Sequence, residues 1–288
     1  MPSPTEITVS QLSRLIGTPD APVLIDLRID EDFNDDPRLL PCARRHSFST
    51  ISNLAPELID QSVVVYCQKG KKISQGAMAL LRGLGVRAET LEGGQFAWRD
   101  KGGLLIPAAK LPMRIDAQDE CQGSLWVTRH RPKIDRIACP WLIRRFIDPR
   151  ARFLFVSPSE VTMVAEKFNA EPFDVEGAFW NHRGNHCTFD TMIEEFELES
   201  GPLKKLATII RGADLGEHDL APQSAGLVAA SLGLSRMYRD DWQQLEASMV
   251  LYDGLYRWCR DATEEVHDWS VHSGQLSSTM EAKREINQ

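Results

Sequence analysis

The chain has 288 residues, of which 42% are hydrophobic and 26% charged, and its formal net charge is −8. This length suits two domains better than one core, and the composition is that of an ordinary globular protein. An acidic chain has no general attraction for nucleic acid or for an anionic membrane surface, and no apolar run reaches membrane-spanning length. We therefore expect neither a nucleic acid nor a membrane as partner.

The N-terminus and the cysteines predict a cytoplasmic location. The first residues lack the basic and apolar regions of a signal peptide. The cysteines form no CxxC pair, which is typical of individual thiols in a reducing compartment rather than of a disulfide framework. They are Cys42, Cys67, Cys121, Cys139, Cys187 and Cys259.

Residues 1–106 alternate short apolar runs with amphipathic segments, which predicts an α/β domain with a parallel sheet. Ser10 is a candidate cap for the first helix. The predicted strands are Val23–Leu27, Val63–Tyr66 and Val86–Leu91, and the predicted helices are Thr8–Leu15, Ala55–Ile59 and Ser74–Leu84.

Residues 107–124 lose this rhythm and are predicted to be a linker. A second domain is predicted over residues 125–262, with a strand at Leu125–Thr128 and a mainly helical α+β character after Phe155. Apolar residues of helical period predict helices over Pro222–Tyr238 and Asp240–Arg260. The polar residues 263–288 are predicted to be a frayed helix or a disordered tail.

Cys67 is the strongest candidate for chemistry. It follows the β-branched run Val63–Tyr66 and precedes a short loop and a predicted helix, where backbone N–H groups and the helix dipole converge. Lysines 69, 71 and 72 add positive charge, and all of these features favour the nucleophilic thiolate. The alternatives are that Cys67 is a small buried apolar residue and that the lysines form a solvated face.

Three features together resemble the rhodanese (sulfurtransferase) domain over about residues 5–106. They are the Asp26-x-Arg28 strand end, the Cys67-x-x-Gly70 loop before a helix, and the Gly93-Gly94…Trp98 turn. The resemblance implies that Cys67 accepts a sulfane sulfur as a persulfide and passes it to a thiol or to cyanide, with no cofactor. The residues that it places around the substrate are Asp26, Arg28, Gln68, Lys69, Gly70, Lys71 and Lys72.

The length and composition of the loop discriminate between chemistries. Cysteine-dependent phosphatases and arsenate reductases need an arginine six residues after the nucleophile, and here that residue is Ile73. Many active rhodaneses carry an arginine late in the loop, where this chain has Lys72, which offers charge but no bidentate fork. Polysulfide, persulfide and protein thiol therefore stand beside thiosulfate as candidate donors.

The start of the second domain is strongly basic. Residues 126–152 contain eight basic and two acidic residues, a segregation of charge that can attract an oxyanion. Pro140 disfavours helical backbone at Cys139 and suits a helix that starts at residue 140 or 141. Cys139 would then cap that helix, with Lys133 and Arg136 nearby; the alternative is a packed thiol beside solvated charges.

Two polar clusters follow in the second domain. A loop presents two histidines, a thiol and a carboxylate within nine residues, a set that could bind a transition metal or consist of surface residues. These residues are His182, His186, Cys187 and Asp190. Arg211 and Asp214 belong to a cluster between two helices, for which helix capping and an interhelical salt bridge are the simpler interpretation.

Five collinear motifs over about residues 125–262 resemble the C-terminal domain of ChrB-type chromate-resistance proteins. The motifs are the run Trp126–Asp148, His186-Cys-x-Phe-Asp190, Arg211-Gly-Ala-Asp214, Ala221–Gly226 and Leu255–Cys259. The resemblance implies an association with chromate resistance and, in some members, chromate-responsive regulation. Those regulators carry a different N-terminal domain, so DNA binding is not implied; as second-domain site candidates we name Lys133, Asp135, Arg136, Cys139, Arg211 and Asp214.

The sequence supports three hypotheses of different classes. The first is a cytoplasmic sulfurtransferase in which Cys67 carries persulfide sulfur and the second domain recognises an oxyanion, a metal or an acceptor. The second is a chromate- or metal-responsive sensor that uses the rhodanese fold to bind an anion without turnover. The third is chromate reduction by the thiols of Cys67, Cys139 or Cys187. Oligomeric state is left open.

Overall fold

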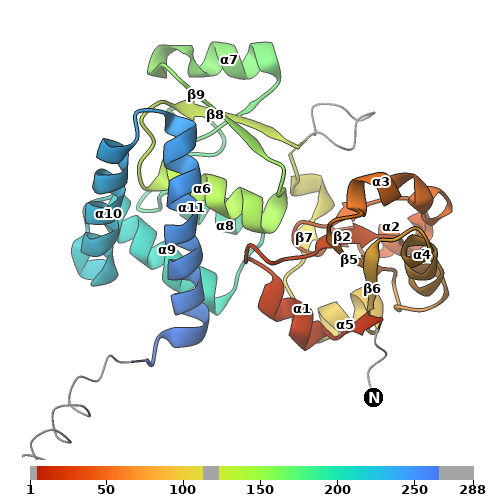
Figure 1. Ribbon diagram of the computed structural model, residues 1–288. Helices are drawn as coiled ribbons and strands as arrows, with labels where there is room; N and C mark the ends of the chain where they lie inside the picture. Colours follow the sequence, from red (N-terminus) through yellow and green to blue (C-terminus); the bar gives the residue numbers. More distant parts are fainter. Residues whose placement is uncertain (1–4, 113–122, 266–288) are drawn as a thin grey trace, which may run out of the picture.

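The computed structural model describes residues 5–112 and 123–265. Two halves lie side by side in it, one built from the orange and yellow part of the chain and one from the green and blue part (Figure 1). Each half contains a parallel sheet of its own. The second half is otherwise mainly helical, so the predicted fold class is confirmed.

The first half is organised by a five-stranded parallel sheet in the order β1-β6-β5-β2-β4. Its strands are β1 Glu6–Ile7, β2 Val23–Asp26, β4 Arg44–Arg45, β5 Ser62–Tyr66 and β6 Arg87–Leu91. The helices around it are α1 Val9–Leu15, α2 Asp30–Asp35, α3 Ala55–Leu58, α4 Lys72–Gly83 and α5 Gly94–Asp100, with 3-10 segments η1 Phe48–Leu54 and η2 Ala108–Lys110. The central strands β5 and β2 are buried, as their β-branched composition predicts.

Helix α1 begins one residue later than predicted and is capped differently. The Oγ1 atom of Thr8 accepts a hydrogen bond from the backbone N–H of Gln11, and the Gln11 side chain accepts one from the backbone N–H of Thr8. This reciprocal arrangement satisfies two helix-end donors. The expectation that Ser10 caps the helix is wrong, because Ser10 lies inside α1.

The first residues of the predicted linker extend the first half. Strand β7 (Ile106–Pro107) pairs with β3 (Arg38–Leu39) in an antiparallel two-stranded sheet. The side chain of Lys110 then reaches Glu195 in the second half, with 2.8 Å between Nζ and Oε2. The middle of the predicted linker, residues 113–122, and the predicted tail after residue 265 lie outside the described residues.

The second half combines a three-stranded parallel sheet, in the order β10-β8-β9, with a group of helices. The strands are β8 Leu125–Arg129, β9 Arg152–Val156 and β10 Glu171–Pro172. The helices are α6 Asp135–Leu142, α7 Val161–Phe168, α8 Thr188–Glu195, α9 Gly201–Asp214, α10 Gln223–Met237 and α11 Asp241–Arg257. Shorter helical segments are η3 Ile143–Ile147, η4 Pro158–Glu160, η5 His218–Leu220 and η6 Trp258–Ala262.

One hydrophobic cluster runs through both halves. It joins Leu12 of α1 to Phe146 and Tyr256 of the second half. Gly17 lies at this junction with φ +78°, and a Cβ there would be only 2.5 Å from the Phe146 ring, so the close approach requires glycine. The backbone N–H of Cys42 donates to the carbonyl of Phe146 over 2.8 Å. Within the described ranges, no helix has the length and apolar composition needed to cross a membrane.

Candidate functional site

Cys67 lies where the two central strands of the first sheet end. Strands β2 and β5 pair in register from Val23 opposite Val63 to Asp26 opposite Tyr66, and Cys67 is the next residue after β5. The carboxyl edge of a parallel sheet is the usual place for a ligand in this class of fold. Cys67, the strongest candidate from the sequence, therefore lies at the edge of the sheet where a site is expected.

The Cys67 thiol is held inside the loop that leads into α4. Its Sγ lies 3.4 Å from the Oγ of Ser74, whose hydroxyl can donate either to this sulfur or to the carbonyl of Lys71 at 3.2 Å. Burial alone would raise the pKa of this thiol, but hydrogen bonds from Ser74 and from backbone N–H groups of the loop outweigh it, so the pKa of Cys67 is lowered. The loop therefore shifts this thiol toward its thiolate form, which is the predicted direction.

The start of helix α5 contacts the Cys67 loop through two backbone hydrogen bonds and the close approach of a glycine. The N-terminus of α5 donates to it, from the N–H of Gln95 to the carbonyl of Cys67 and from that of Phe96 to Gln68, each over 3.0 Å. Gly94 has φ +62°, and a Cβ there would lie 2.2 Å from the Cys67 carbonyl oxygen. The predicted Gly93-Gly94 turn thus holds the backbone of the Cys67 loop in place.

Asp26 and Arg28 form a fully buried ion pair beside the loop. The shortest contact joins Arg28 Nη2 to Asp26 Oδ2 over 2.5 Å, and both side chains have zero exposure. Arg28 also donates to the backbone carbonyls of Asp36 and Arg38 over 2.8 Å. These contacts give the pair a structural role, and its contact with substrate stays a prediction.

A cleft opens above Cys67 and combines positive charge with apolar surface. Gln68 and the exposed lysines Lys69, Lys71 and Lys72 line it, whereas Gly70 is buried against the α5 turn. Its apolar lining includes three large side chains that are unusually exposed: Ile29 at 38%, Phe48 at 46% and Leu80 at 48%. Such a surface suits a ligand that carries both a negative charge and apolar groups.

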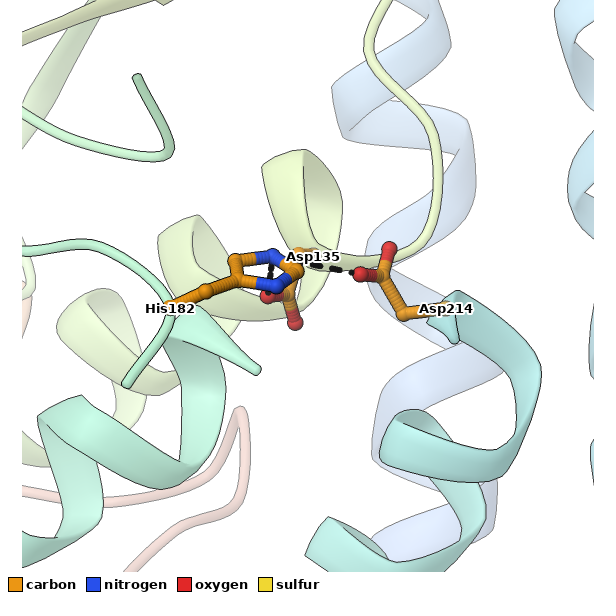
Figure 2. Close-up of side chains that lie close together, drawn as sticks. All are labelled: Asp135, His182 and Asp214. Atoms are coloured by element: carbon orange, nitrogen blue, oxygen red, sulfur yellow. Dashed lines mark ion pairs between the residues drawn. The ribbon is translucent and has the colours of Figure 1, made fainter. Parts of the chain in front are cut away.

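The second half contains a separate cluster of ionisable groups around His182 (Figure 2). The imidazole Nε2 lies 3.3 Å from Asp214 Oδ2, 3.3 Å from Asp174 Oδ1 and 3.5 Å from Asp135 Oδ2. Asp135 begins α6, Asp214 ends α9, and Asp174 and His182 lie in the segment between β10 and α8. We call these four residues the His182 cluster.

The close carboxylates strongly change the proton affinities in the His182 cluster. Hydrogen bonds to Asp135 and Asp174 raise the pKa of His182 to about 10, despite its partial burial. Burial and the charges of Asp135 and Asp174 raise the pKa of Asp214 to about 7. Perturbed groups that meet in one place are typical of functional sites, although buried ion-pair networks also show them.

The structure does not assemble the metal set predicted from the loop sequence. In the described part of the chain, the histidine, cysteine and carboxylate groups close enough to share an ion are Asp135, His182 and Asp214, whose ligand atoms lie within 4.8 Å of one another. His186 is exposed in the loop, and the buried Cys187 caps α8. The prediction from the close spacing of these residues in the sequence is wrong, because the side chain of His182 faces residues that are distant in the chain.

Asp190 and Arg211 form an ion pair between two helices. The Nη1 atom of Arg211 lies 2.8 Å from Asp190 Oδ1, so its salt bridge links α9 to the preceding helix α8 rather than to the helix that follows. Asp190 also accepts a hydrogen bond from the backbone N–H of Cys187 over 3.1 Å. Only Asp214 of the predicted Arg211–Asp214 cluster faces His182.

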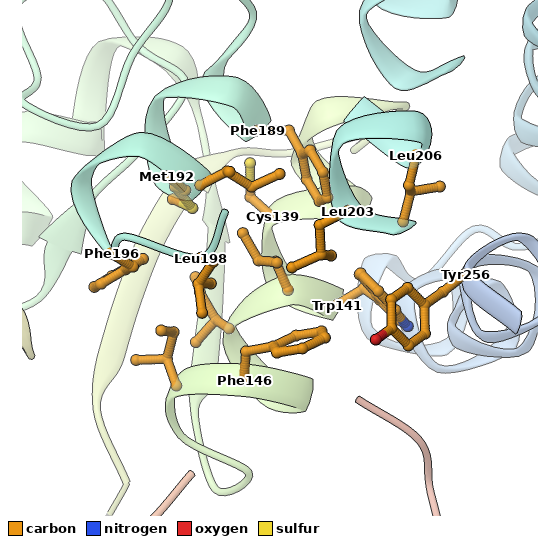
Figure 3. Packing of buried hydrophobic residues seen from close by; sticks show 14 of the residues in the cluster. Cys139, Trp141, Phe146, Phe189, Met192, Phe196, Leu198, Leu203, Leu206 and Tyr256 are labelled. Carbon is orange, nitrogen blue, oxygen red and sulfur yellow. The ribbon is translucent and has the colours of Figure 1, made fainter. Parts of the chain in front are cut away.

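The expectation that Cys139 caps a helix is wrong. Helix α6 begins at Asp135, and Cys139 and Pro140 lie inside it, followed by the π-helical turn η3. Cys139 has zero exposure among the packed apolar side chains of Figure 3. Burial and the charge of Asp135 raise the pKa of this thiol well above its ordinary value, which is the opposite of activation. The burial of the residues around Pro140 thus outweighs the tendency of a proline to lie at the start of a helix rather than inside it.

Most arginines of the basic segment are used in internal pairs. Arg129 and Arg136 approach Asp174, with Nη2 and Nε at 3.0 and 3.3 Å from its Oδ2, whereas Lys133 is exposed. The other pairs are Arg144 with Glu246, Arg145 with Asp253 and Arg150 with Glu57. The acidic partners in these pairs thus offset most of the local excess of positive charge. Oxyanion binding by this segment stays a prediction.

Asp174 is the residue of the His182 cluster that sequence reasoning missed. It follows β10 between Glu171 and Glu176, in a stretch without histidine or cysteine. A signal could have been its place after a strand of a parallel sheet, the position that made Cys67 a candidate. Its two oxygens are taken up by Thr188 and Arg129 as well as by His182.

Comparison with known families defines the class of both halves. Residues 8–101 match the rhodanese-like domain and residues 126–259 match the ChrB C-terminal domain. The first half is therefore similar to rhodanese-like domains and the second half to the C-terminal domain of ChrB. Cys67, Cys139, Cys187 and Cys259 carry free thiols, in agreement with the prediction of individual thiols.

Individual proteins with similar sequence or structure were also found. Protein ChrB of Cupriavidus metallidurans is 33% identical over 173 residues, which are 56% of this chain and 51% of that protein, so the chain spans about half of its length. A rhodanese-related protein of Thermoplasma volcanium is 20% identical, with a TM-score of 0.31, over 35% of this chain and 96% of its own. A rhodanese-like domain protein of Staphylococcus aureus is 26% identical, with a TM-score of 0.30, over 34% and 94%.

Proposed function

We propose that the chain is a cytoplasmic sulfurtransferase in which Cys67 carries sulfane sulfur as a persulfide. The observation that carries the proposal is the setting of the thiol: Cys67 Sγ lies 3.4 Å from Ser74 Oγ, and the loop lowers the pKa of this thiol. The same hydrogen bonds that stabilise a thiolate would stabilise the terminal sulfur of a persulfide, which is also an anion.

The reaction balances as two exchanges at sulfur. The Cys67 thiolate attacks the outer sulfur of a donor R–S–S⁻, the bond between the donor sulfurs breaks, and R–S⁻ leaves while Cys67–S–S⁻ forms. Cyanide or an acceptor thiolate then attacks the terminal sulfur of the Cys67 persulfide. The S–S bond breaks, the terminal sulfur stays on the acceptor, and Cys67 is released as a thiolate that is ready for another cycle. Neither step needs a metal or an external oxidant.

The cleft favours an organic persulfide over a small inorganic donor. Exposed Ile29, Phe48 and Leu80 would cover the apolar part of such a donor, and Lys69, Lys71 and Lys72 would attract its charge. Lysine ammonium groups can attract the oxygens of thiosulfate as point charges, but they cannot form the bidentate hydrogen bonds that an arginine guanidinium forms. The donor class therefore follows from the same surface that surrounds the thiol.

The experiment is a donor scan of the full chain beside two cysteine variants. Polysulfide, an organic persulfide and thiosulfate serve as donors, cyanide serves as acceptor, and intact mass detects the gain of one sulfur atom. We expect Cys67→Ala to lose both the adduct and the transfer. Cys259→Ala is the matched control, since burial raises the pKa of that thiol to about 11. Undiminished transfer by Cys67→Ala would refute the proposal.

The alternative function is a sensor that binds chromate or another oxyanion without turnover. The small exposure of Cys67, 6%, favours it, because a donor must reach this sulfur. The ChrB-type domain connects either function to chromate resistance through the resemblance of residues 126–259. Stoichiometric chromate binding without any sulfur adduct would support the sensor.

A further inference from the structure

We propose that Asp135, His182 and Asp214 bind one divalent transition-metal ion of the zinc class, in the ChrB-type domain. The three residues come from α6, from the segment before α8 and from the end of α9, so the folded chain alone assembles them. Figure 2 shows the imidazole of His182 beside the carboxylate groups of Asp135 and Asp214. This site is separate from the Cys67 cleft and does not depend on the proposed sulfur transfer.

The distances from the imidazole nitrogen to the two carboxylates fit a small tetrahedral ion, and the three ligand atoms all lie within 4.8 Å of one another. Zinc bonds to nitrogen and oxygen are about 2.0–2.2 Å long, which separates tetrahedral ligand atoms by roughly 3.3–3.6 Å. His182 Nε2 lies 3.3 Å from Asp214 Oδ2 and 3.5 Å from Asp135 Oδ2. One imidazole and two carboxylates would leave a fourth position for water or a ligand, whereas calcium requires six to eight oxygens.

Asp135 supplies an independent indication that a ligand belongs here. Its side chain is 1% exposed, and its Oδ1 is buried without a hydrogen-bond partner, a costly state for a carboxylate oxygen. Its Oδ2 accepts from the backbone N–H of Thr188 and faces His182 Nε2. A cation between the two side chains would compensate the carboxylate that the protein leaves incompletely satisfied.

The surroundings orient the ligands and leave the site accessible. Thr188 holds both neighbouring acids, through its N–H to Asp135 and through its Oγ1 to Asp174 over 3.0 Å. Asp174 is already paired with Arg129 and Arg136, so we assign it to positioning His182 rather than to the ion. The side chains of His182 and Asp214 are 34% and 20% exposed, which gives an ion a way in.

The test is metal binding by the full chain after removal of ions with a chelator. Zn²⁺ is titrated by calorimetry, and Co²⁺ is used as a spectroscopic probe, whose strong visible absorption reports tetrahedral coordination. We expect one ion per chain in wild type. Affinity should fall by more than about 100-fold in His182→Gln and Asp214→Asn, since loss of even an outer-shell partner costs 10–100-fold.

His186→Gln is the matched control, because His186 is an exposed histidine of the same loop. It should bind zinc like wild type, and so should Cys67→Ala, which separates this proposal from sulfur transfer. Circular dichroism checks that each variant is folded. Absence of binding by wild type, or equal binding by wild type and His182→Gln, would overturn the proposal and leave the cluster as an internal ion-pair network.

Discussion

At the scale of single residues, reactivity in this protein follows the surroundings of each thiol. Cys67 and Cys139 are both buried, but only Cys67 meets hydrogen-bond donors, from Ser74 and the loop backbone. Cys139 lies near the carboxylate of Asp135, whose charge opposes a thiolate. The pKa values of these two thiols therefore move in opposite directions although both are enclosed.

Ser74→Ala tests the origin of this difference. Loss of the hydroxyl removes a hydrogen bond that stabilises the Cys67 thiolate, so the pKa of Cys67 should rise. At a pH below the pKa, less thiolate is then present and alkylation slows, by roughly 10-fold if the bond contributes about 1.5 kcal/mol. The measurement is the pH profile of iodoacetamide labelling, which should move to higher pH. An unchanged profile would assign the activation to the backbone alone.

At the scale of elements, the Cys67 loop depends on the start of α5. The N–H of Gln95 donates to the Cys67 carbonyl, and Gly94 approaches so closely that no side chain fits between them. The loop and the α5 turn are about 25 residues apart in the sequence and behave as one unit in the structure. A substitution in the α5 turn should therefore change the reactivity of the Cys67 thiol without contacting it directly.

Gly94→Ala should destabilise the protein by about 2 kcal/mol or more, because its φ of +62° and its contacts both exclude a Cβ. It should also raise the rate at which Cys67 is labelled by bulky reagents, as the loop is displaced. Gly83→Ala is the control, since a Cβ at the end of α4 meets no atom within 4 Å, and it should change stability by less than about 1 kcal/mol. Urea unfolding measures both; equal effects would contradict this account.

At the scale of the whole molecule, the two halves are held together by shared packing and by charge. Glu57 of α3 pairs with Arg44 of the first half and with Arg150 of the second, its Oε1 lying 3.0 and 2.8 Å from the respective Nη atoms. Arg44 is only 5% exposed, so its charge relies on this carboxylate. The junction is thus built into the fold and is more than a flexible connection.

Glu57→Gln should lower the free energy of unfolding by about 1–3 kcal/mol, because it leaves the buried guanidinium of Arg44 without a counter-charge. Glu199→Gln is the control, since its pair with Lys204 is exposed on both sides and should contribute little to stability. Chemical unfolding of both variants in the same buffer provides the comparison. A loss for Glu57→Gln no larger than for Glu199→Gln would refute this role of the carboxylate.

The sequence by itself determined the central strands, the helix after Cys67 and the reactive edge of the first half, but not its short outer strands or helices α2 and α5. The β-branched run before Cys67, the glycines of the loop and the Gly93-Gly94 turn act over short distances, so their consequences can be predicted from local chemistry. In the second half the local rules failed at Pro140, which lies inside α6, because burial of the whole helix outweighs the preference of one residue.

Only the tertiary structure decided which charged groups meet. His182 was predicted to act with its neighbours His186 and Cys187, yet it faces Asp135, Asp174 and Asp214, which are up to 47 residues away in the chain. Their meeting depends on how α6, α9 and the segment before α8 pack around a common apolar core. Such packing is a property of the entire fold, and no spacing in the sequence records it.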